Sequence, residues 1–252
     1  MHLSPDKKIY FLSDFHLGAP NYTESLVREK RIVTFLEEIK NDADQIFILG
    51  DLFDFWFEYK KVIPKGFVRI LGKLAELTDA GINIHFFVGN HDMWMNGYFE
   101  KELNIKVYHE PKEFDLNGKK FFIAHGDGLG PGDKKYKFLK KVFRNKILNW
   151  LFSVLHPGFG IGLANYFSNK SRAATGNTDE KFLGEDNEWL VSFSKEMEQK
   201  NHFDYYIFGH RHLPIDFKIN DATHYINLGD WIKHNSYAVF NGNSLELNFY
   251  KD

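Results

Sequence analysis

The feature that most constrains the fold of this 252-residue chain is the stretch 46–56, which reads IFILGDLFDFW. Four apolar residues run directly into Gly50 and Asp51, and a second acid, Asp54, follows. A short apolar run of this kind is typical of a buried strand in a parallel sheet, and a glycine lets the chain turn sharply at its end. Because open α/β sheets place ligands outside the carboxyl ends of their strands, we expect Asp51 at a ligand-binding rim.

The same pattern, an apolar run that ends in polar residues, recurs along the chain. We expect such strands at 9–12, 46–49, 82–88, 120–124 and 205–208. Helical periodicity predicts helices at 26–40, 68–80 and 179–200, and short strands at 225–228, 237–240 and 245–250 close an α/β fold. The polar residues at the strand ends are Asp14, His16, Asp51, Asn90, His91, His125, His210 and His212.

These side chains predict a metal site. Imidazole and carboxylate together suit Mn, Fe, Co, Ni or Zn. With His91 left aside, the remaining seven ligands are too many for one ion, but they suit two ions that share a carboxylate, and Asp51 is the natural bridge. The chain has no cysteine, which excludes disulfides and thiolate ligands.

In this order and spacing, the residues resemble the calcineurin-like metallophosphoesterase superfamily, whose pattern is D-x-H, G-D, G-N-H-D/E, H and G-H-x-H. The chain reads DFH at 14–16, GD at 50–51, GNHD at 89–92, HGD at 125–127 and GHRH at 209–212. The resemblance implies a double β-sandwich flanked by helices. It implies one metal held by Asp14, His16, Asp51 and His212, and a second held by Asp51, Asn90, His125 and His210. His91 would face the substrate and Asp92 would orient it.

Three further motifs are similar to those of a family within it, the UDP-2,3-diacylglucosamine hydrolases of lipid A synthesis. They are GDLFDFW, HGDGLGPGD, which ends at Asp133, and LGDW at 228–231. This resemblance implies two metal ions, with Mn²⁺ the usual expectation and Fe or Zn as alternatives. It implies attack of a metal-bridging hydroxide on the α-phosphorus of the UDP-linked glycolipid, which yields UMP and 2,3-diacylglucosamine 1-phosphate.

One position departs from that family. Its best-known members have Arg where this chain has His91, whereas the superfamily pattern has His. Two roles for His91 therefore stay open. It either protonates the leaving oxygen or only stabilises charge on the phosphoryl group.

The segment 134–172 separates residues 1–133 from 173–252, which would together form the metallophosphoesterase core. It holds nine Lys and Arg residues, no Asp or Glu, and many apolar and aromatic residues. Pro157-Gly158 predicts a break between two helices, the second at 161–171. A basic amphipathic helix is typical of membrane-surface binding. The segment could equally form a lid that grips acyl chains, or simply pack on the core.

For several other residues the sequence predicts a role, in most cases with an alternative that stays open. Asp54 is expected to cap a helix or to support the ligands, and Asp127 to fix an imidazole. Asp133 is expected either to bind ribose or uracil or to cap the helix from Lys134. Ser171 and Arg172 are candidate phosphate or nucleotide contacts or a solvated helix end.

Two other functions compete with the lipid hydrolase. One is another metal-dependent phosphodiesterase or phosphatase acting on nucleotides or nucleic acid. The other is a metal-free scaffold that binds proteins, although that predicts lost ligands and all seven are present. Nothing resembles a nucleic-acid module, and no protein partner is implied. Without a signal-like or membrane-spanning apolar run, we expect a cytoplasmic protein, peripheral on the cytoplasmic face of the membrane.

Overall fold

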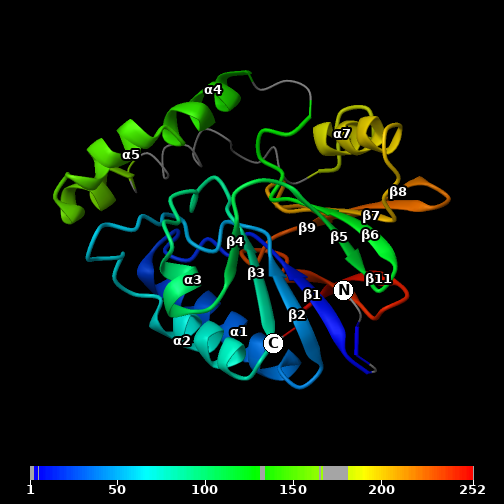
Figure 1. Ribbon diagram of the computed structural model, residues 1–252, viewed down its shortest axis with the longest axis horizontal. Helices are drawn as coiled ribbons and strands as arrows, with labels where there is room; N and C mark the ends of the chain where they lie inside the picture. Colours follow the sequence, from blue (N-terminus) through cyan, green and yellow to red (C-terminus); the bar gives the residue numbers. More distant parts are fainter. Residues whose placement is uncertain (1–2, 5, 131–133, 165, 167–180, 252) are drawn as a thin grey trace.

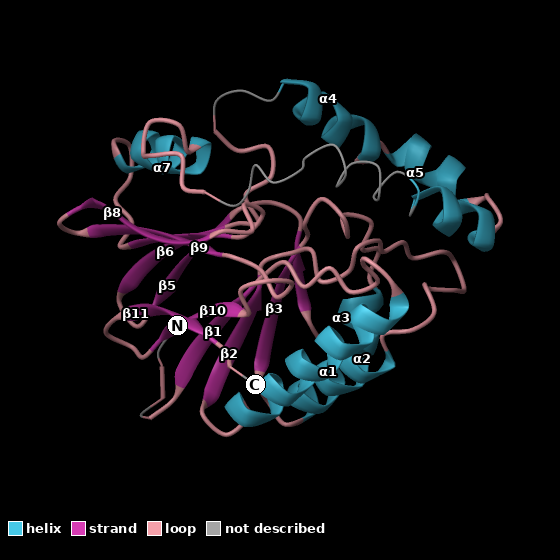
Figure 2. Cartoon of the chain, turned by 180° about the vertical axis from the view of Figure 1, so that it is seen from behind, coloured by secondary structure: helices cyan, strands magenta, loops and turns pink. Residues whose placement is uncertain are grey.

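The computed structural model describes residues 3–4, 6–130, 134–164, 166 and 181–251, and shows two β-sheets stacked face to face with helices on their outer sides (Figures 1 and 2). The expected double β-sandwich flanked by helices is confirmed. Both sheets are mixed. Antiparallel strands lie at one edge of the first sheet and at both edges of the second, and the remaining neighbours are parallel.

The first sheet has the strand order β11-β10-β1-β2-β3-β4. Its strands are β1 (Lys8–Leu12), β2 (Ala43–Ile48), β3 (Asn83–Phe87), β4 (Lys106–Tyr108), β10 (Ser236–Phe240) and β11 (Leu245–Phe249). Strands β1 to β4 are parallel, because α1 (Tyr22–Ile39), α2 (Val68–Asp79) and α3 (Tyr98–Glu102) return the chain between them. These helices bury a continuous apolar cluster against the sheet.

The second sheet has the order β5-β6-β7-β9-β8. Its strands are β5 (Lys112–Leu116), β6 (Lys119–Ile123), β7 (Tyr205–Phe208), β8 (Pro214–Asn220) and β9 (Thr223–Leu228). A second apolar cluster fills the space between the sheets, and a third lies between the second sheet and α7 (Trp189–Glu198). Two sheets thus face each other across a shared core, so the ends of β1, β2, β3, β6 and β7 can meet at one edge.

The strands and helices expected from periodicity are present, with four corrections. Strands β4, β5 and β8 and the short helix α3 were not expected, because each is short and lacks a strong periodic signal. The helix expected at 179–200 is α7, which begins only at Trp189, because residues 181–188 form turns.

Within the segment 134–172, Asn145 separates α4 (Lys134–Phe143) from α5 (Lys146–Ser153) by capping α5. A further helix begins at Pro157, because proline is tolerated in a first helical turn.

The side chain of His85, on β3, is a neutral imidazole that is buried in the core. The ring is buried, stacks on Phe47 with centroids 4.4 Å apart, and places Nε2 3.2 Å from Gln45 Oε1. Its Nδ1 lies 3.0 Å from the Tyr108 hydroxyl. The neutral ring can therefore donate through Nε2 and accept through Nδ1. Burial lowers the pKa of His85 to about 4, and the charge of Lys106 adds to this.

This burial predicts a pH-dependent stability. The unfolded chain binds a proton at His85 below about pH 6.5, whereas the folded chain does not until about pH 4. The free energy of unfolding should therefore fall by about 2 kcal/mol between pH 7 and pH 5 from this group alone. Because other buried imidazoles also contribute, urea titrations should show a loss that is smaller by about 2 kcal/mol in His85→Gln than in the wild type. The exposed His156→Gln variant serves as control, and equal pH slopes for wild type and His85→Gln would contradict the account.

Candidate metal centre

The structure brings the seven predicted ligand side chains together where β1, β2, β3, β6 and β7 end. Ligand atoms of Asp14, His16, Asp51 and His212 lie within 4.8 Å of one another, as do those of Asp51, His125 and His210. Asn90 completes the second group, because its Oδ1 lies 3.2 Å from His125 Nε2. Two ligand groups therefore exist, and Asp51 belongs to both.

The distances show how tightly these atoms converge. His16 Nε2 lies 3.6 Å from Asp51 Oδ2, and His125 Nε2 lies 3.5 Å from the same oxygen. In the first group, His212 Nε2 is 3.1 Å from both Asp14 Oδ1 and His16 Nε2. One carboxylate oxygen thus stands between two imidazoles that come from different sheets.

The backbone at this edge is strained. Five of the seven residues have left-handed φ angles between 44° and 65°: Asp14, His16, Asp51, His210 and His212. Non-glycine residues in this region cost roughly 1–3 kcal/mol each, and such strain is concentrated at functional sites. The chain turns sharply just after each strand, which aims side chains on neighbouring turns at one point.

Glycines next to the ligands allow this approach. A Cβ on Gly89 would lie 2.1 Å from Asp51 Oδ1, and one on Gly209 would lie 2.5 Å from Asp14 Oδ2. No side chain fits at either position without moving a carboxylate. The glycines of the G-N-H-D and G-H-R-H motifs are therefore steric requirements of the site.

The ligand atoms of this cluster can be satisfied by metal ions better than by hydrogen bonds to one another. His16 Nε2 and His212 Nε2 face each other at 3.1 Å, so at most one of them can donate a hydrogen bond to the other. The buried atom His16 Nδ1 has no hydrogen-bond partner among the described residues, and Asp14 Oδ1 lies between two imidazoles, 3.1 Å from His212 Nε2 and 3.6 Å from His16 Nε2. Buried polar atoms without partners are costly, and lone pairs that converge in this way are what a cation satisfies. Carboxylate, amide and imidazole donors suit first-row divalent metals.

The pKa values of Asp51 and His125 also reflect how closely carboxylates and imidazoles approach in this cluster. Burial alone would raise the pKa of Asp51, but the charges of His125 and His91 hold it far below its ordinary range. Burial alone would lower the pKa of His125, but the adjacent Asp51 raises it to about 10. A metal must displace this proton before it can bind His125, so metal affinity should increase with pH.

The second ring nitrogen of three ligand imidazoles faces an oxygen atom. His125 Nδ1 lies 2.6 Å from the Leu49 carbonyl, and His16 Nδ1 lies 3.6 Å from Asp54 Oδ1. His212 Nδ1 lies 3.6 Å from Asp230 Oδ2. Such partners fix ring orientation and leave Nε2 for a metal. Asp54 thus supports the ligands rather than capping a helix, while Asp230 was missed because it lies far along the chain in the LGDW motif.

Two expectations about carboxylates are wrong. Asp92 does not orient His91, because its carboxylate accepts backbone N–H groups of Gly89 and Leu52 at 2.8 Å and of Asp51 at 3.3 Å. It orders the two ligand loops instead. Asp127 does not bind an imidazole, because its Oδ2 lies 2.6 Å from both the Tyr136 hydroxyl and Lys140 Nζ. Since both partners lie on α4, Asp127 attaches that helix beside the centre.

His91 lies over the first ligand group. Its ring is 4.9 Å from that of His16, and its Nδ1 lies 2.9 Å from the Asp54 carbonyl oxygen. A carbonyl accepts, so Nδ1 carries the hydrogen of this bond. Burial lowers the pKa of His91 to about 4, although Asp51 opposes the shift.

Sequence reasoning predicted no role for Arg211, which stands between His210 and His212 and positions them. Its side chain is buried, lies 3.2 Å from Glu188 Oε2, and donates to the Lys181 carbonyl at 2.7 Å. The pair joins the two ligand histidines to the start of α7. The candidate substrate contacts Asp133, Ser171 and Arg172 lie outside the described residues.

Comparison with known proteins agrees with this geometry. Residues 7–214 match the family model of the calcineurin-like phosphoesterases, and the chain belongs to that family. It is 42% identical to a UDP-2,3-diacylglucosamine hydrolase of Porphyromonas gingivalis, over 97% of this chain and 98% of that protein. It is 28% identical to a protein of the same name from Actinobacillus succinogenes, over 89% of this chain and 92% of that protein. It is also 28% identical to one from Vibrio atlanticus, over 95% of this chain and 96% of that protein.

The close approach at Gly89 yields a test. Gly89→Ala should displace Asp51, because the new Cβ would meet its carboxylate and its backbone nitrogen. We expect the variant to lose most of its bound metal, measured as metal per chain by mass spectrometry after dialysis against Mn²⁺. The matched control is Gly72→Ala within α2, where no atom lies within 4 Å and the free energy of unfolding should rise by up to ~1 kcal/mol. Full metal content in folded Gly89→Ala would refute this role of Gly89.

Proposed function

We propose that this chain is a dinuclear metal hydrolase that cleaves UDP-2,3-diacylglucosamine at its α-phosphorus, yielding UMP and 2,3-diacylglucosamine 1-phosphate. The observation that carries the proposal is the buried Asp51 carboxylate. Its Oδ2 lies within 3.6 Å of His16 Nε2 and of His125 Nε2, so it stands between two ligand groups. The substrate follows from the 42% identity to a hydrolase of that name over nearly the whole length of both proteins.

The residues proposed to hold the metals fall into two sets that share Asp51. The first is Asp14, His16, Asp51 and His212, and the second is Asp51, Asn90, His125 and His210. Two divalent ions, when bound, would stabilise charge on phosphoryl oxygens and lower the pKa of a water molecule. We propose Mn²⁺, although the same donors accept Fe or Zn.

The protein's own contribution is orientation and charge. The Leu49 carbonyl, Asp54 and Asp230 hold three imidazoles in place. His91 would act on the substrate through Nε2, because Nδ1 is engaged by Asp54. Both proposed roles for His91 require a proton on Nε2, and with Nδ1 already protonated this means the imidazolium form. Since burial disfavours that form, we propose that the negative charge of the bound diphosphate stabilises it.

The segment 134–172 is proposed to cover the centre as a lid on a core formed by residues 1–133 and 173–252. Three contacts support this placement. Lys140 pairs with Asp127, Arg144 pairs with Glu110, and Trp94 Nε1 donates to the Phe143 carbonyl at 2.9 Å. Asp133, Ser171 and Arg172, within or beside the segment, remain proposed substrate contacts.

The reaction is tested by product analysis. Purified protein with Mn²⁺ and UDP-2,3-diacylglucosamine in detergent should release UMP and the lipid monophosphate in equal amounts, measured by mass spectrometry. EDTA and Asp51→Ala should each abolish release, because both remove the shared metal site. Hydrolysis of bis(p-nitrophenyl) phosphate without release of UMP would instead indicate another phosphodiesterase of the same family.

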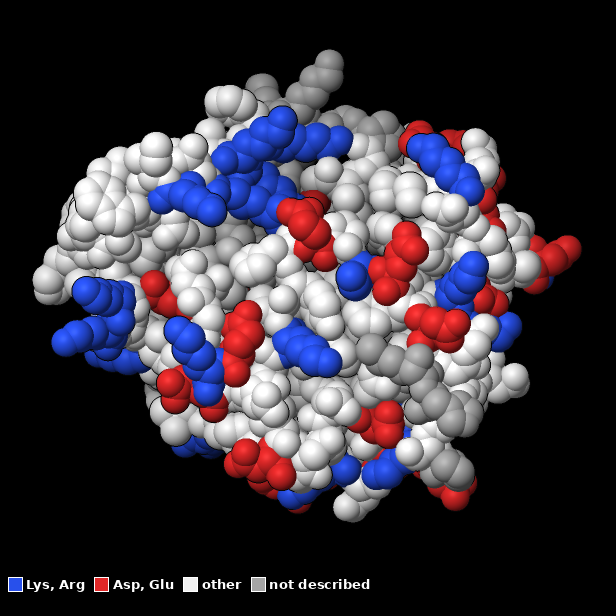
Figure 3. Space-filling model, viewed as in Figure 1, with Lys and Arg blue, Asp and Glu red and all other residues white. Residues whose placement is uncertain are grey.

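We further propose that α5 contacts the membrane surface that holds the lipid. Among the described residues, no helix combines the length and apolar composition needed to cross a bilayer. Helix α5 nevertheless has no buried residue, and Ile147, Trp150 and Leu151 are exposed. Apart from Lys146 in its first turn, α5 carries no charged residue, and Figure 3 shows an uncharged surface beside the Lys and Arg side chains gathered over α4. Apolar residues next to cations are typical of helices that lie in a lipid–water interface.

A vesicle experiment tests this contact. Replacing Ile147 and Trp150 with Ser should reduce binding to phosphatidylglycerol vesicles at least tenfold, because burial of each side chain contributes roughly 1.5–3 kcal/mol. Binding is measured by co-sedimentation. Phe249→Ser is the matched control, because Phe249 is also half exposed but lies on β11, in the first sheet. Equal loss in both variants, or no loss in either, would count against α5 as the membrane contact.

A further inference from the structure

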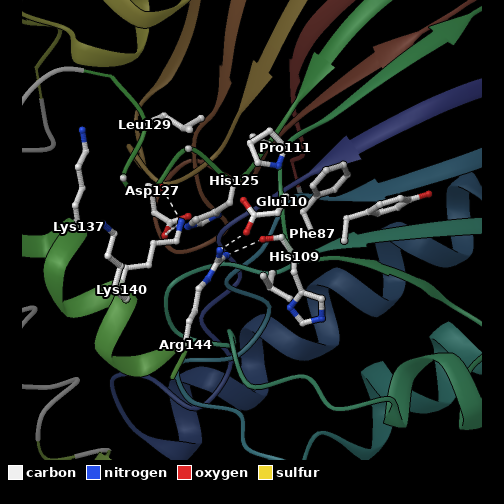
Figure 4. Close-up of a pocket in the computed structure, with 16 residues that line it drawn as sticks. Phe87, His109, Glu110, Pro111, His125, Asp127, Leu129, Lys137, Lys140 and Arg144 are labelled. Atoms are coloured by element: carbon white, nitrogen blue, oxygen red, sulfur yellow. Dashed lines mark hydrogen bonds and ion pairs between the residues drawn. The ribbon is translucent and has the colours of Figure 1, made fainter. Parts of the chain in front are cut away.

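A cavity of about 360 Å³ opens directly beside the metal centre. Its floor is the end of β6, including His125 and Asp127, one wall is α4, and the opposite wall is the connection from β4 to β5 (Figure 4). This volume falls in the range of small-molecule sites. Because His125 belongs both to the cavity and to the second ligand group, a molecule bound here can reach the reacting phosphorus.

One face of α4 supplies the charge of the cavity. The cavity is lined by Lys137, Lys140, Lys141 and Arg144, whose spacing of three, four and seven residues places them on one side of a helix. Lys140 is neutralised by Asp127, and Arg144 by Glu110. Lys137 and Lys141 form no ion pair with any described residue. The four cations and two carboxylates therefore leave two positive charges in excess.

The wall opposite α4 carries one charged residue, Glu110, which is paired with Arg144, and otherwise side chains with rings. It includes the rings of Tyr108, His109 and Pro111. Tyr108 is held in place, because its hydroxyl lies 3.0 Å from His85 Nδ1 and its ring stacks on Phe87 with centroids 4.9 Å apart. Aromatic residues on one wall and cations on the other suit a ligand with both a planar ring and a phosphate group.

An apolar cluster lies elsewhere beside the same centre. Phe55, Phe57 and Tyr59 pack with Trp94 and Phe152 in an aromatic cluster that adjoins the loops of Asp54 and His91. None of these cluster residues lines the cationic cavity, and no charged residue belongs to the cluster. With the diphosphate of a substrate at the metals, its anionic half would therefore bind on the side of the cationic cavity.

We propose that the cavity between α4 and the β4–β5 connection is the subsite for the nucleotide half of the substrate, and that Lys137 and Lys141 bind its phosphate. This inference rests on the proposed function, which supplies UMP as the leaving product. A phosphate monoester carries about 1.5 to 2 negative charges at pH 7, which matches the two positive charges in excess. The cavity therefore binds UMP more tightly than uridine, and the product competes with the substrate.

The test measures the dissociation constant of UMP by calorimetry in the presence of Mn²⁺. Lys141→Gln should weaken UMP binding about tenfold, because a hydrogen bond to a charged group contributes roughly 1.5–3 kcal/mol. Lys137→Gln should act in the same direction. The matched control is Lys112→Gln, an exposed lysine two residues from Glu110 that does not line the cavity. Inorganic phosphate is the second probe, and it should lose less affinity than UMP, because it can bind at the metals alone.

Equal UMP affinity in wild type, Lys137→Gln and Lys141→Gln would overturn the proposal, even if the protein cleaves the lipid substrate. An equal loss in Lys112→Gln would also overturn it, because net charge and not the cavity would then be responsible. If the lipid is not cleaved but UMP binding depends on Lys141 and not on Lys112, the nucleotide subsite stands and the lipid half of the proposed function falls.

Discussion

The structure depends on one buried carboxylate. Asp51 is 1% exposed and lies at the edge where the two sheets meet, with His16 on one side and His125 on the other. A lone buried carboxylate would be strongly destabilising, and here the surrounding imidazoles hold its pKa far below the ordinary range. The strained turns at five ligand residues persist because packed sheets and two glycine contacts leave the chain no alternative.

Around this carboxylate, the same few residues connect the centre to the rest of the molecule. Asp92 ties the loops after β2 and β3 together through backbone N–H groups. Asp127 extends the connection to α4, and Arg211 with Glu188 extends it to α7. Residues within the metal-binding motifs are thus attached to both α4 and α7.

Sequence alone was sufficient to predict which seven side chains converge, because each follows an apolar strand and strand ends are the most regular feature of such a fold. It was not sufficient for contacts between distant loops. Asp92 and Asp127 stand next to ligands, so a role in orienting imidazoles was the natural expectation. Their actual partners, the Leu52 amide and Tyr136, are set by how the loops meet in space. Asp230 and Arg211 were missed for the same reason, and the short strands β4, β5 and β8 because their periodic signal is weak.

The most direct test of the shared carboxylate is a crystal structure of the protein grown with Mn²⁺, with anomalous scattering measured at the manganese edge. Two peaks roughly 3.5–4 Å apart are expected, with one Asp51 oxygen within bonding distance of both. Asp14, His16 and His212 should surround one peak, and Asn90, His125 and His210 the other. A single peak, or two peaks of which only one contacts Asp51, would contradict the claim that this residue organises a dinuclear centre.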